Sequence, residues 1–247
     1  MLFASVFMVL WVLTSRTSGQ SVTQTPSRLA IKEGVAVFIN CTYQYSGVAY
    51  LYWYVQHSHS EGPQLLLTEY TGKETGDAFF AEHLKADKTF HLRKEAGGLS
   101  DSAAYFCAVR DTGFLSPRSS SGRGRLDLVQ SDAVFQSHPE ISIAEGQDAI
   151  LLCNFSTADS NPYLFWYRQF PNKSPQHLLT KTRYSAADQN FAPTKYSGTL
   201  NPETKTVDLK IKDVSLQDAA VYVCALRGNN QLHFGAGTSL TVSPMEE

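Results

Sequence analysis

The chain has 247 residues, with 21 basic and 23 acidic side chains and a formal net charge of −2 at pH 7. This length accommodates one large domain or two domains of about 100 to 150 residues that each bury their own core, and we expect two. The balanced charge excludes a strong attraction to nucleic acid or to an anionic membrane, so partners must be recognised by local surface.

An apolar run from Met1 to Leu13 opens the chain and is followed by small polar residues as far as Gly19. The pattern predicts a secretory signal peptide over residues 1–19, although its start carries no basic side chain. A buried N-terminal strand is the alternative interpretation. The run is too short to span a bilayer, and no stretch of about 20 apolar residues follows it.

Apolar residues then alternate with period two, which is typical of half-buried strands. The pattern occurs in VAVFIN before Cys41 and in TFHLRK from Thr89, and again in DAILL before Cys153 and in TVDLKI from Thr206. Turn-forming segments such as KEGV, SEGP and LNPETK separate these runs, and no 12-residue window keeps a helical stripe. The sequence therefore predicts an all-β fold.

The chain contains one unit twice. YLYWYVQH from Tyr50 matches YLFWYRQF from Tyr163, and LSDSAAYFCAVR from Leu99 matches LQDAAVYVCALR from Leu216. Four cysteines in a secreted chain predict two disulfides, for which three pairings are possible. The repeat favours one bridge within each copy: Cys41 with Cys107, and Cys153 with Cys224.

A Cys…Trp…Cys frame, with Asp-x-Ala-x-Tyr-x-Cys before its second cysteine, occurs in both copies. The frame resembles the immunoglobulin sandwich. The resemblance implies two tandem V-type β sandwiches, over residues 20–130 and 131–247, in which each disulfide joins two sheets under a packed indole. The implied core residues, with tyrosines that hydrogen-bond back across a corner, are Trp53, Trp166, Tyr105 and Tyr222.

Asp101 and Asp218 at these corners could be read as catalytic acids, but a corner aspartate usually pairs with a basic residue on a neighbouring strand. Lys195 is the expected partner of Asp218, whereas DAFFAEHL offers none for Asp101, so we expect the first pair to be absent. His57 and His59 are a conceivable metal pair without a third ligand. We expect no catalytic residues, no metal and no cofactor.

Both copies resemble T-cell receptor variable domains of the alpha/delta type. QSVTQTP, PQLLL and LSDSAAYFCAVR carry the resemblance in the first copy, and YLFWYRQFPNKSPQHLL and DAAVYVCALR in the second. HFGAGTSLTV, near the end, resembles a joining segment. The resemblance implies antigen recognition, either of a peptide or lipid on a major-histocompatibility-type molecule or of an intact antigen. It also implies a beta- or gamma-type variable chain as the partner of the second domain.

The joining-like strand needs glycine where its backbone bulges, while Phe234 turns outward to cover the partner domain. Gln169 and Tyr167 complete this expected pairing face in the second copy. The first copy keeps Gln56, but Ser121 stands where the aromatic residue is expected. We therefore expect the second domain to pair with a separate chain and the first domain not to pair.

Loops at one end of each sandwich are the expected antigen-binding surface. They span residues 44–49, 70–74 and 109–120 in the first copy and 157–162, 184–188 and 226–233 in the second. Loop support is the alternative role for each candidate contact residue. The candidates are Tyr45, Tyr70, Arg110, Phe114, Arg118, Asp159, Tyr184, Arg227 and Asn229.

N-glycosylation sequons occur at Asn40, Asn154 and Asn172, and Asn172 is the favoured acceptor because it lies in a predicted turn. The joint VQSDAVFQSHP has no Gly/Ser spacer, which predicts a short, stiff connection and a rod of two domains.

The sequence stops just beyond the joining-like strand, where the constant region of such a receptor chain would begin. We therefore expect a chain without its own signalling region. We expect an extracellular protein, at the plasma membrane if a constant and membrane region is supplied and otherwise secreted. The alternatives are a germline innate immune-type receptor, a secreted variable-domain decoy and an adhesion molecule.

Overall fold

The computed structural model describes residues 21–45, 47, 49–58, 61–70, 79–111, 132–171, 173–184, 189–228 and 231–244. The predicted signal peptide and the predicted joint before residue 132 lie outside these ranges. Among the described residues, no helix is both long enough and apolar enough to cross a membrane.

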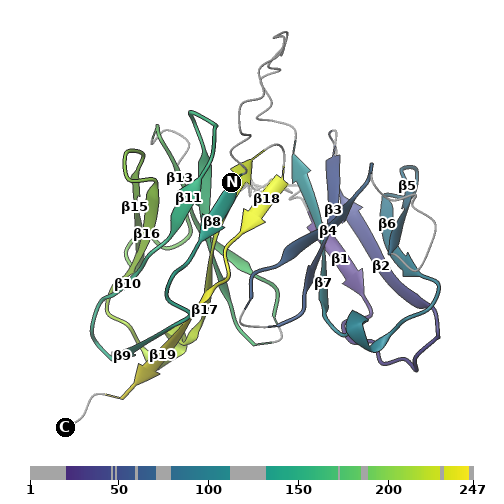
Figure 1. The fold of residues 1–247 in the computed structure, drawn as a ribbon, viewed down its shortest axis with the longest axis horizontal. Coiled ribbons are helices and arrows are strands. Elements are labelled where there is room, and N and C mark those ends of the chain that lie inside the picture. Colours follow the sequence, from purple (N-terminus) through teal and green to yellow (C-terminus); the bar gives the residue numbers. More distant parts are fainter. Residues whose placement is uncertain are drawn as a thin grey trace, which may run out of the picture.

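The expected all-β architecture is confirmed: two β sandwiches stand side by side (Figure 1). Their regular structure consists of strands and short 3-10 turns. Period-two burial in β2, Val37–Gln44, and in β16, Thr206–Ile211, follows the alternation in the sequence. Hydrophobic patterning thus sets which face of each strand enters a core.

The first sandwich consists of a four-stranded sheet, β1-β2-β6-β5, and a three-stranded sheet, β4-β3-β7. Its strands are β1 Ser21–Thr25, β2 Val37–Gln44, β3 Ala49–Gln56, β4 Gln64–Thr68, β5 Phe80–Leu84, β6 Thr89–Lys94 and β7 Ala104–Asp111. The short 3-10 turn η1, Leu99–Asp101, precedes β7.

The second sandwich consists of two packed sheets. One has the order β10-β16-β11-β8, and β15 also pairs with β16. The other, larger sheet has the order β14-β13-β12-β17-β19-β9. In that larger sheet, β18 pairs with β17, and β9 runs parallel to β19. The turn η3, Leu216–Asp218, precedes β17. The strands of the second sandwich are β8 Ala133–Phe135, β9 Glu140–Ala144, β10 Ala149–Leu151, β11 Asn154–Ser156, β12 Tyr163–Gln169, β13 Gln176–Thr182, β14 Gln189–Asn190, β15 Tyr196–Asn201, β16 Thr206–Ile211, β17 Ala220–Gly228, β18 Gln231–Phe234 and β19 Thr238–Ser243.

Each sandwich has its own hydrophobic core around an inter-sheet disulfide. The predicted bridges are confirmed: Cys41 is joined to Cys107, and Cys153 to Cys224. Trp53 and Trp166 are fully buried and lie directly across the strand pairing from Cys107 and Cys224. Tying off such long loops typically stabilises a domain by about 4 kcal/mol.

The tyrosine corners have the geometry implied by the motif. The Tyr105 hydroxyl donates to the Asp101 carbonyl oxygen at 2.8 Å, and the Tyr222 hydroxyl donates to the Asp218 carbonyl oxygen at 2.9 Å. Burial raises the pKa of Tyr105 to about 12 and raises that of Tyr222 further. Both phenols therefore stay protonated and keep donating at neutral pH.

The expected pair between Lys195 and Asp218 is present at 2.7 Å, but the expectation of no partner for Asp101 was wrong. Lys94 approaches the Asp101 carboxylate at 2.8 and 2.9 Å. The partner comes from the end of β6, whereas the prediction considered only the residues that lead into β5. Two adjacent strands reach this corner, so either can supply the cation.

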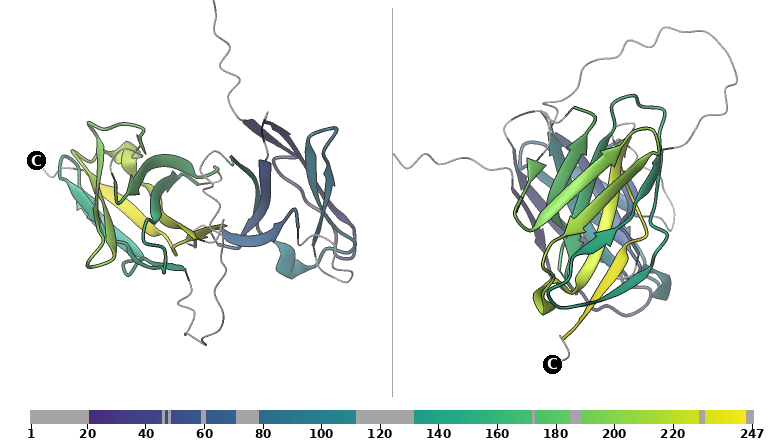
Figure 2. Two further views of the ribbon diagram at one scale, coloured as in Figure 1. Left: turned by 90° about the horizontal axis from the view of Figure 1, so that it is seen from above. Right: turned by 90° about the vertical axis from the view of Figure 1, so that its left-hand side faces the viewer.

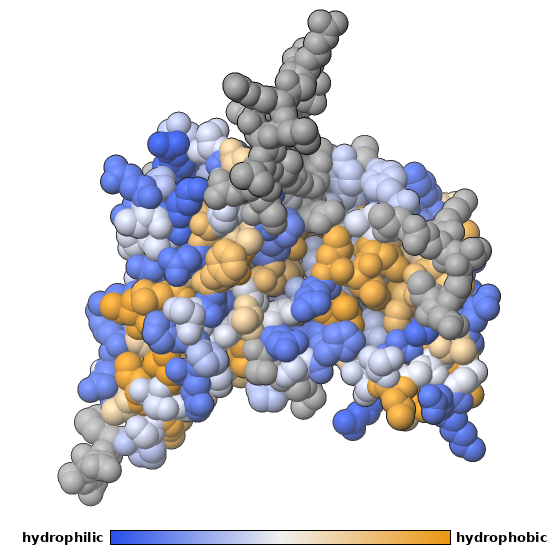
Figure 3. Space-filling model, in the orientation of Figure 1, coloured by the Kyte–Doolittle hydropathy of each residue, from blue (hydrophilic) through white to orange (hydrophobic). Residues whose placement is uncertain are grey.

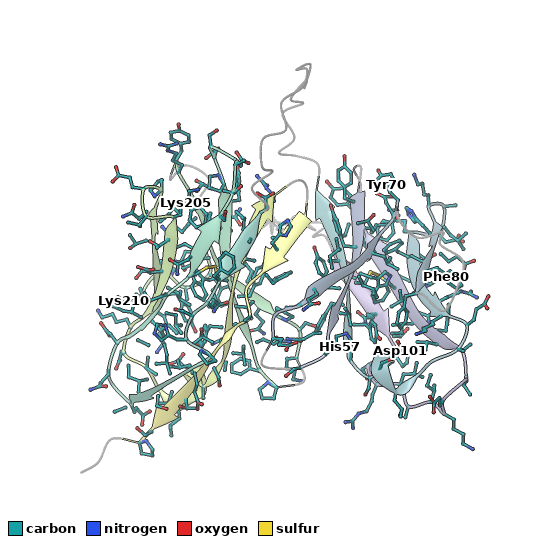
Figure 4. All side chains as sticks on the ribbon, in the orientation of Figure 1. His57, Tyr70, Phe80, Asp101, Lys205 and Lys210 are labelled. Carbon is teal, nitrogen blue, oxygen red and sulfur yellow. A yellow bond between two sulfur atoms is a disulfide. The ribbon has the colours of Figure 1, made fainter. Side chains whose placement is uncertain are left out.

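The expected rod is also wrong, because the domains pack flank to flank with their loop ends pointing the same way. Viewed along the line that joins them, one domain lies behind the other (Figure 2). Tyr70 and Lys205 lie at the same end of the molecule, and Asp101 lies at the other end (Figure 4). The physical reason is that each domain has an outward sheet face that only another domain can cover.

Candidate functional site

The strand β3 is buried on both of its faces, which identifies the contact between the domains. Leu51 and Trp53 point into the core of the first domain. Tyr52, Tyr54 and Gln56 point the other way, yet they are only 5%, 4% and 3% exposed. In an isolated sandwich this outer face would be solvated, so the second domain provides the cover.

Two glutamines hold the centre of the contact. Nε2 of Gln56 donates to Oε1 of Gln169 at 3.0 Å, and Nε2 of Gln169 donates to Oε1 of Gln56 at 2.9 Å. The same two nitrogens also donate to loop carbonyls, at Glu61 and at Lys173. Both side chains are 3% exposed, and both amides are satisfied, which removes the penalty of burying them.

Phe234 lies between a tyrosine of each domain. Its ring centroid is 5.5 Å from that of Tyr54, edge to face, and 5.7 Å from that of Tyr167 in its own domain. Both separations lie within the range of favourable aromatic pairs. Burial raises the pKa of the Tyr167 phenol to about 12, as expected for a side chain shielded from water. The four predicted pairing residues thus lie in one contact, formed within the chain.

Backbone approach across the contact is close at one point. A Cβ atom added to Gly62 would overlap the carbonyl oxygen of Gly235 and come within 3.1 Å of the Phe234 Cβ. Both glycines are buried, as is Pro63 beside Gly62. The sequence did not single out Gly62, whose turn SEGP was read only as a break between strands.

The contact is asymmetric. The loop at Gly62 and Pro63 in the first domain is buried, whereas the matching Ser174 is exposed and Pro175 half-buried in the second. Phe234 covers the first loop, and the residue expected in its place in the first domain, Ser121, lies outside the described residues. The first domain therefore contacts the second through an aromatic residue that the second domain supplies, and the expectation that the first domain does not pair with a separate chain stays a prediction.

A half-buried glutamine, Gln136, positions the joining-like strands. Oε1 of Gln136 accepts from the backbone N–H of Cys224 at 3.0 Å and of Gly237 at 3.1 Å. Nε2 of Gln136 donates to the Tyr222 carbonyl at 2.9 Å and the Thr238 hydroxyl at 3.1 Å. Gly237 has φ +93°, a conformation that favours glycine. This bracket ties β17 to the start of β19, just after the turn that follows Phe234.

In the described part of the first domain, Gln24 makes the two corresponding bonds to β7. Gln24 binds the Tyr105 carbonyl at 2.7 Å and the Cys107 N–H at 3.1 Å. Sequence reasoning missed both glutamines, although each stands shortly before a proline at the start of its copy, in QTP and QSHP. Aligning the starts of the two repeats would have found them.

Among the described strands, β7 pairs only with β3, whereas its counterpart β17 also pairs with β18 and β19. Residues 103–109 are accordingly half-buried, and apolar side chains gather over this part of the first domain (Figure 3). The predicted bulged strand from Gly122 to Leu128 lies outside the described residues.

At the loop end, Tyr70 and Tyr184 are the most exposed of the candidate contacts that the structure describes, at 76% and 66%. Asp159 is also exposed and shapes its loop: it accepts from the Asn161 N–H at 2.9 Å. Tyr45 packs partly on the first core, and the Arg227 guanidinium lies 3.5 Å from the centre of the Tyr163 ring. The latter two side chains support loops.

The remaining candidates lie outside the described part of the chain. They are Phe114, Arg118 and Asn229, together with the side chain of Arg110. Asn172 and His59 fall there too, so glycosylation of Asn172 stays a prediction, and so does the expectation that His57 and His59 hold no metal.

The two described sequons differ in exposure. Asn154 is exposed at the end of a strand pairing, opposite Phe135, which is 57% exposed. Leu152, two residues before Asn154, is 42% exposed. Asn40 is half-buried and lies opposite Thr25 on β1. Of these two, Asn154 is the more accessible to a glycosyltransferase.

Comparison with known proteins gives a consistent result. The family model described as "Immunoglobulin V-set domain" matches residues 24–125 and 136–243. "T-cell receptor alpha chain V region RL-5" of Oryctolagus cuniculus is 46% identical over 105 residues, which are 42% of this chain and 78% of the relative. "T cell receptor alpha variable 18" of Homo sapiens is 45% identical over 104 residues, which are 42% of this chain and 93% of the relative. The human "T cell receptor alpha variable 38-2/delta variable 8" is 36% identical over 102 residues, which are 41% of this chain and 86% of the relative.

Proposed function

The chain belongs to the immunoglobulin V-set family, as two tandem domains of the T-cell receptor alpha/delta variable type, and we propose that it recognises antigen through one surface formed by the loop ends of both domains. The family comprises antigen-recognition receptor domains, not enzymes, and its domains are extracellular.

The observation that supports a shared surface is the parallel alignment of the domains. The contact between Gln56 and Gln169 holds the sandwiches flank to flank, so the loop end of each faces the same direction (Figure 4). Tyr70 and Tyr184 stand exposed at that end, one from each domain. Exposed tyrosines suit this role because they offer a large amphipathic contact at low cost in side-chain entropy.

The ligand class we propose is a peptide or lipid displayed by a major-histocompatibility-type molecule. A surface that spans two domains presents several loops at once, which suits a broad composite ligand. An intact antigen is the other outcome, and the same experiment separates them.

The test uses fluorescent multimers of the purified chain on cells that each express one presenting molecule, loaded with peptide or lipid mixtures. Changing Tyr70 and Tyr184 together to Ala should reduce staining of any positive line at least tenfold, because interface tyrosines commonly contribute a kcal/mol or more each. The matched control changes Leu99 and Leu216 to Ala, which are 83% and 50% exposed in the turns before β7 and β17. Staining that survives the tyrosine changes, or is lost equally in the control, would refute the shared surface.

For the partner of the second domain, the resemblance suggests a separate beta- or gamma-type variable chain. That chain would need Gln169 and Phe234, which here contact the first domain instead, and Tyr167, which packs on Phe234. A receptor head formed by the chain's own two domains is therefore the arrangement that we propose.

A further inference from the structure

We infer that the first domain is the dedicated partner of the second, and that their pairing within one chain closes the second domain's face to a separate variable chain. This inference rests on the proposed function and deepens it, since it names the partner that completes the recognition surface. Its test needs no antigen, so the two can fail independently.

The polar groups at the centre of the face are already used. Gln169 has two N–H donors and one carbonyl oxygen, and the three engage Gln56 Oε1, the Lys173 carbonyl and Gln56 Nε2. A competing chain must first break the reciprocal pair and then restore the same bonds. It would therefore gain nothing in polar contacts over the first domain.

The steric fit is specific to the first domain. Its loop meets the Gly235 backbone at Gly62, where a Cβ atom would overlap the carbonyl oxygen. Tyr54 meets the Phe234 ring edge to face in the same contact. Separation of the domains would expose Phe234 together with Tyr52 and Tyr54, which are only 5% and 4% exposed in the paired state. A cluster of exposed aromatic side chains of this kind is unfavourable for a domain in water.

Covalent linkage adds to this preference. Two linked modules meet at an effective concentration of the order of millimolar. A separate variable chain at micromolar concentration must therefore bind about a thousandfold more tightly than the first domain to replace half of it. One feature would help such a competitor: an aromatic residue of its own could cover Pro175, which the first domain leaves half-buried.

The experiment measures the mass of the full-length chain by size-exclusion chromatography with light scattering, alone and with a tenfold excess of a purified receptor beta-type variable domain. We expect the mass of one chain in both cases. A one-to-one complex with the added domain would overturn the inference. A mass of two chains would also overturn it, because pairing would then occur between copies.

A steric variant makes the test independent of the added partner. Gly62→Ala should push the loop away from Gly235 and raise the hydroxyl-radical oxidation rate of Tyr54 about 5- to 150-fold, since overpacking a tight contact typically costs about 1–3 kcal/mol. Gly98→Ala is the matched control: a Cβ there meets nothing closer than 3.8 Å. Intact Cys41–Cys107 and an unchanged circular dichroism spectrum would show that the first domain still folds. Equal Tyr54 oxidation in both variants would overturn the inference.

Discussion

The reciprocal bonds between Gln56 and Gln169 make a quantitative prediction about single and double substitutions. Changing Gln169 to Leu keeps the approximate shape of the side chain but removes a donor and an acceptor from Gln56, which is 3% exposed. A buried amide left with unmet bonds costs about 1–3 kcal/mol. Taking about 2 kcal/mol, the ratio of paired to separated domains should fall by roughly 30-fold.

The double variant should behave differently. When Gln56 and Gln169 are both Leu, no buried amide is left unpaired, and replacing both partners of a hydrogen bond by apolar groups is often nearly neutral. The separated fraction should then return to within about fivefold of the parent. The two substitutions are thus expected to be strongly non-additive.

The assay is the alkylation rate of a reporter thiol at Pro63→Cys, in the buried loop beside Gly62. The reporter reacts when the loop leaves the second domain, so its rate follows the separated fraction. The same reporter in the parent chain sets the reference, and a thiol at the exposed Ser174 corrects for intrinsic reactivity. Single variants that label at the parent rate, or a double variant whose effect equals the sum of the two, would refute the paired-amide account.

Three further substitutions test other parts of the structure. Phe234→Ala should raise the labelling rate of the same reporter about tenfold or more, because a half-buried interface aromatic contributes about 1.5–3 kcal/mol. The urea unfolding of the second domain should change little. An unchanged labelling rate would contradict the anchoring role of Phe234. Lys195→Met should destabilise the second domain by about 2 kcal/mol at pH 7, because Asp218, which is 6% exposed, loses its cation. Burial alone would raise the pKa of the Asp218 carboxyl, but hydrogen bonds from Lys195 and Ser215 lower it overall. The stabilisation from this ion pair is therefore present above the pKa of the unfolded chain, and it is lost as the pH falls through the lower pKa of the folded state. The difference between parent and variant in urea unfolding should accordingly shrink below about pH 4, and a constant difference down to pH 2 would contradict the assignment. Finally, the chain secreted from mammalian cells should carry a glycan on Asn154 that covers Phe135 and Leu152. The Asn154→Gln variant should then show no mass shift on glycosidase treatment, and it should self-associate more because the two apolar side chains are uncovered. An unmodified Asn154 peptide would count against this prediction.

Local patterning was enough to predict each domain. Alternating apolar residues, the Cys…Trp…Cys frame and the corner tyrosines depend on contacts within one sandwich, and each repeats in both copies. The pairing residues were recognisable from the family resemblance, since Gln56 and Gln169 each stand three residues after the framework tryptophan and Phe234 opens the joining-like FGAG. Their partner was not recognisable from these positions.

The arrangement of the domains depends on surface complementarity, which no spacing in the sequence encodes. Ser121 led to the expectation that the first domain would not pair with a separate chain, because the aromatic anchor is missing at that position. Among the described residues, Phe234 packs on Tyr54 of the first domain, and Gly62 leaves room for the opposing backbone. The prediction for Asp101 was wrong for a different reason: its cation comes from Lys94 at the end of β6, seven residues before Asp101, and not from the start of β5.

The central claim is that two variable-type domains of one chain pair flank to flank with aligned loop ends. Small-angle X-ray scattering of the full-length chain, separated by size immediately before exposure, tests it most directly. We predict a single compact distance distribution that fits the paired arrangement in Figures 1 and 2. A distribution with two maxima, typical of two domains held end to end, would contradict the account.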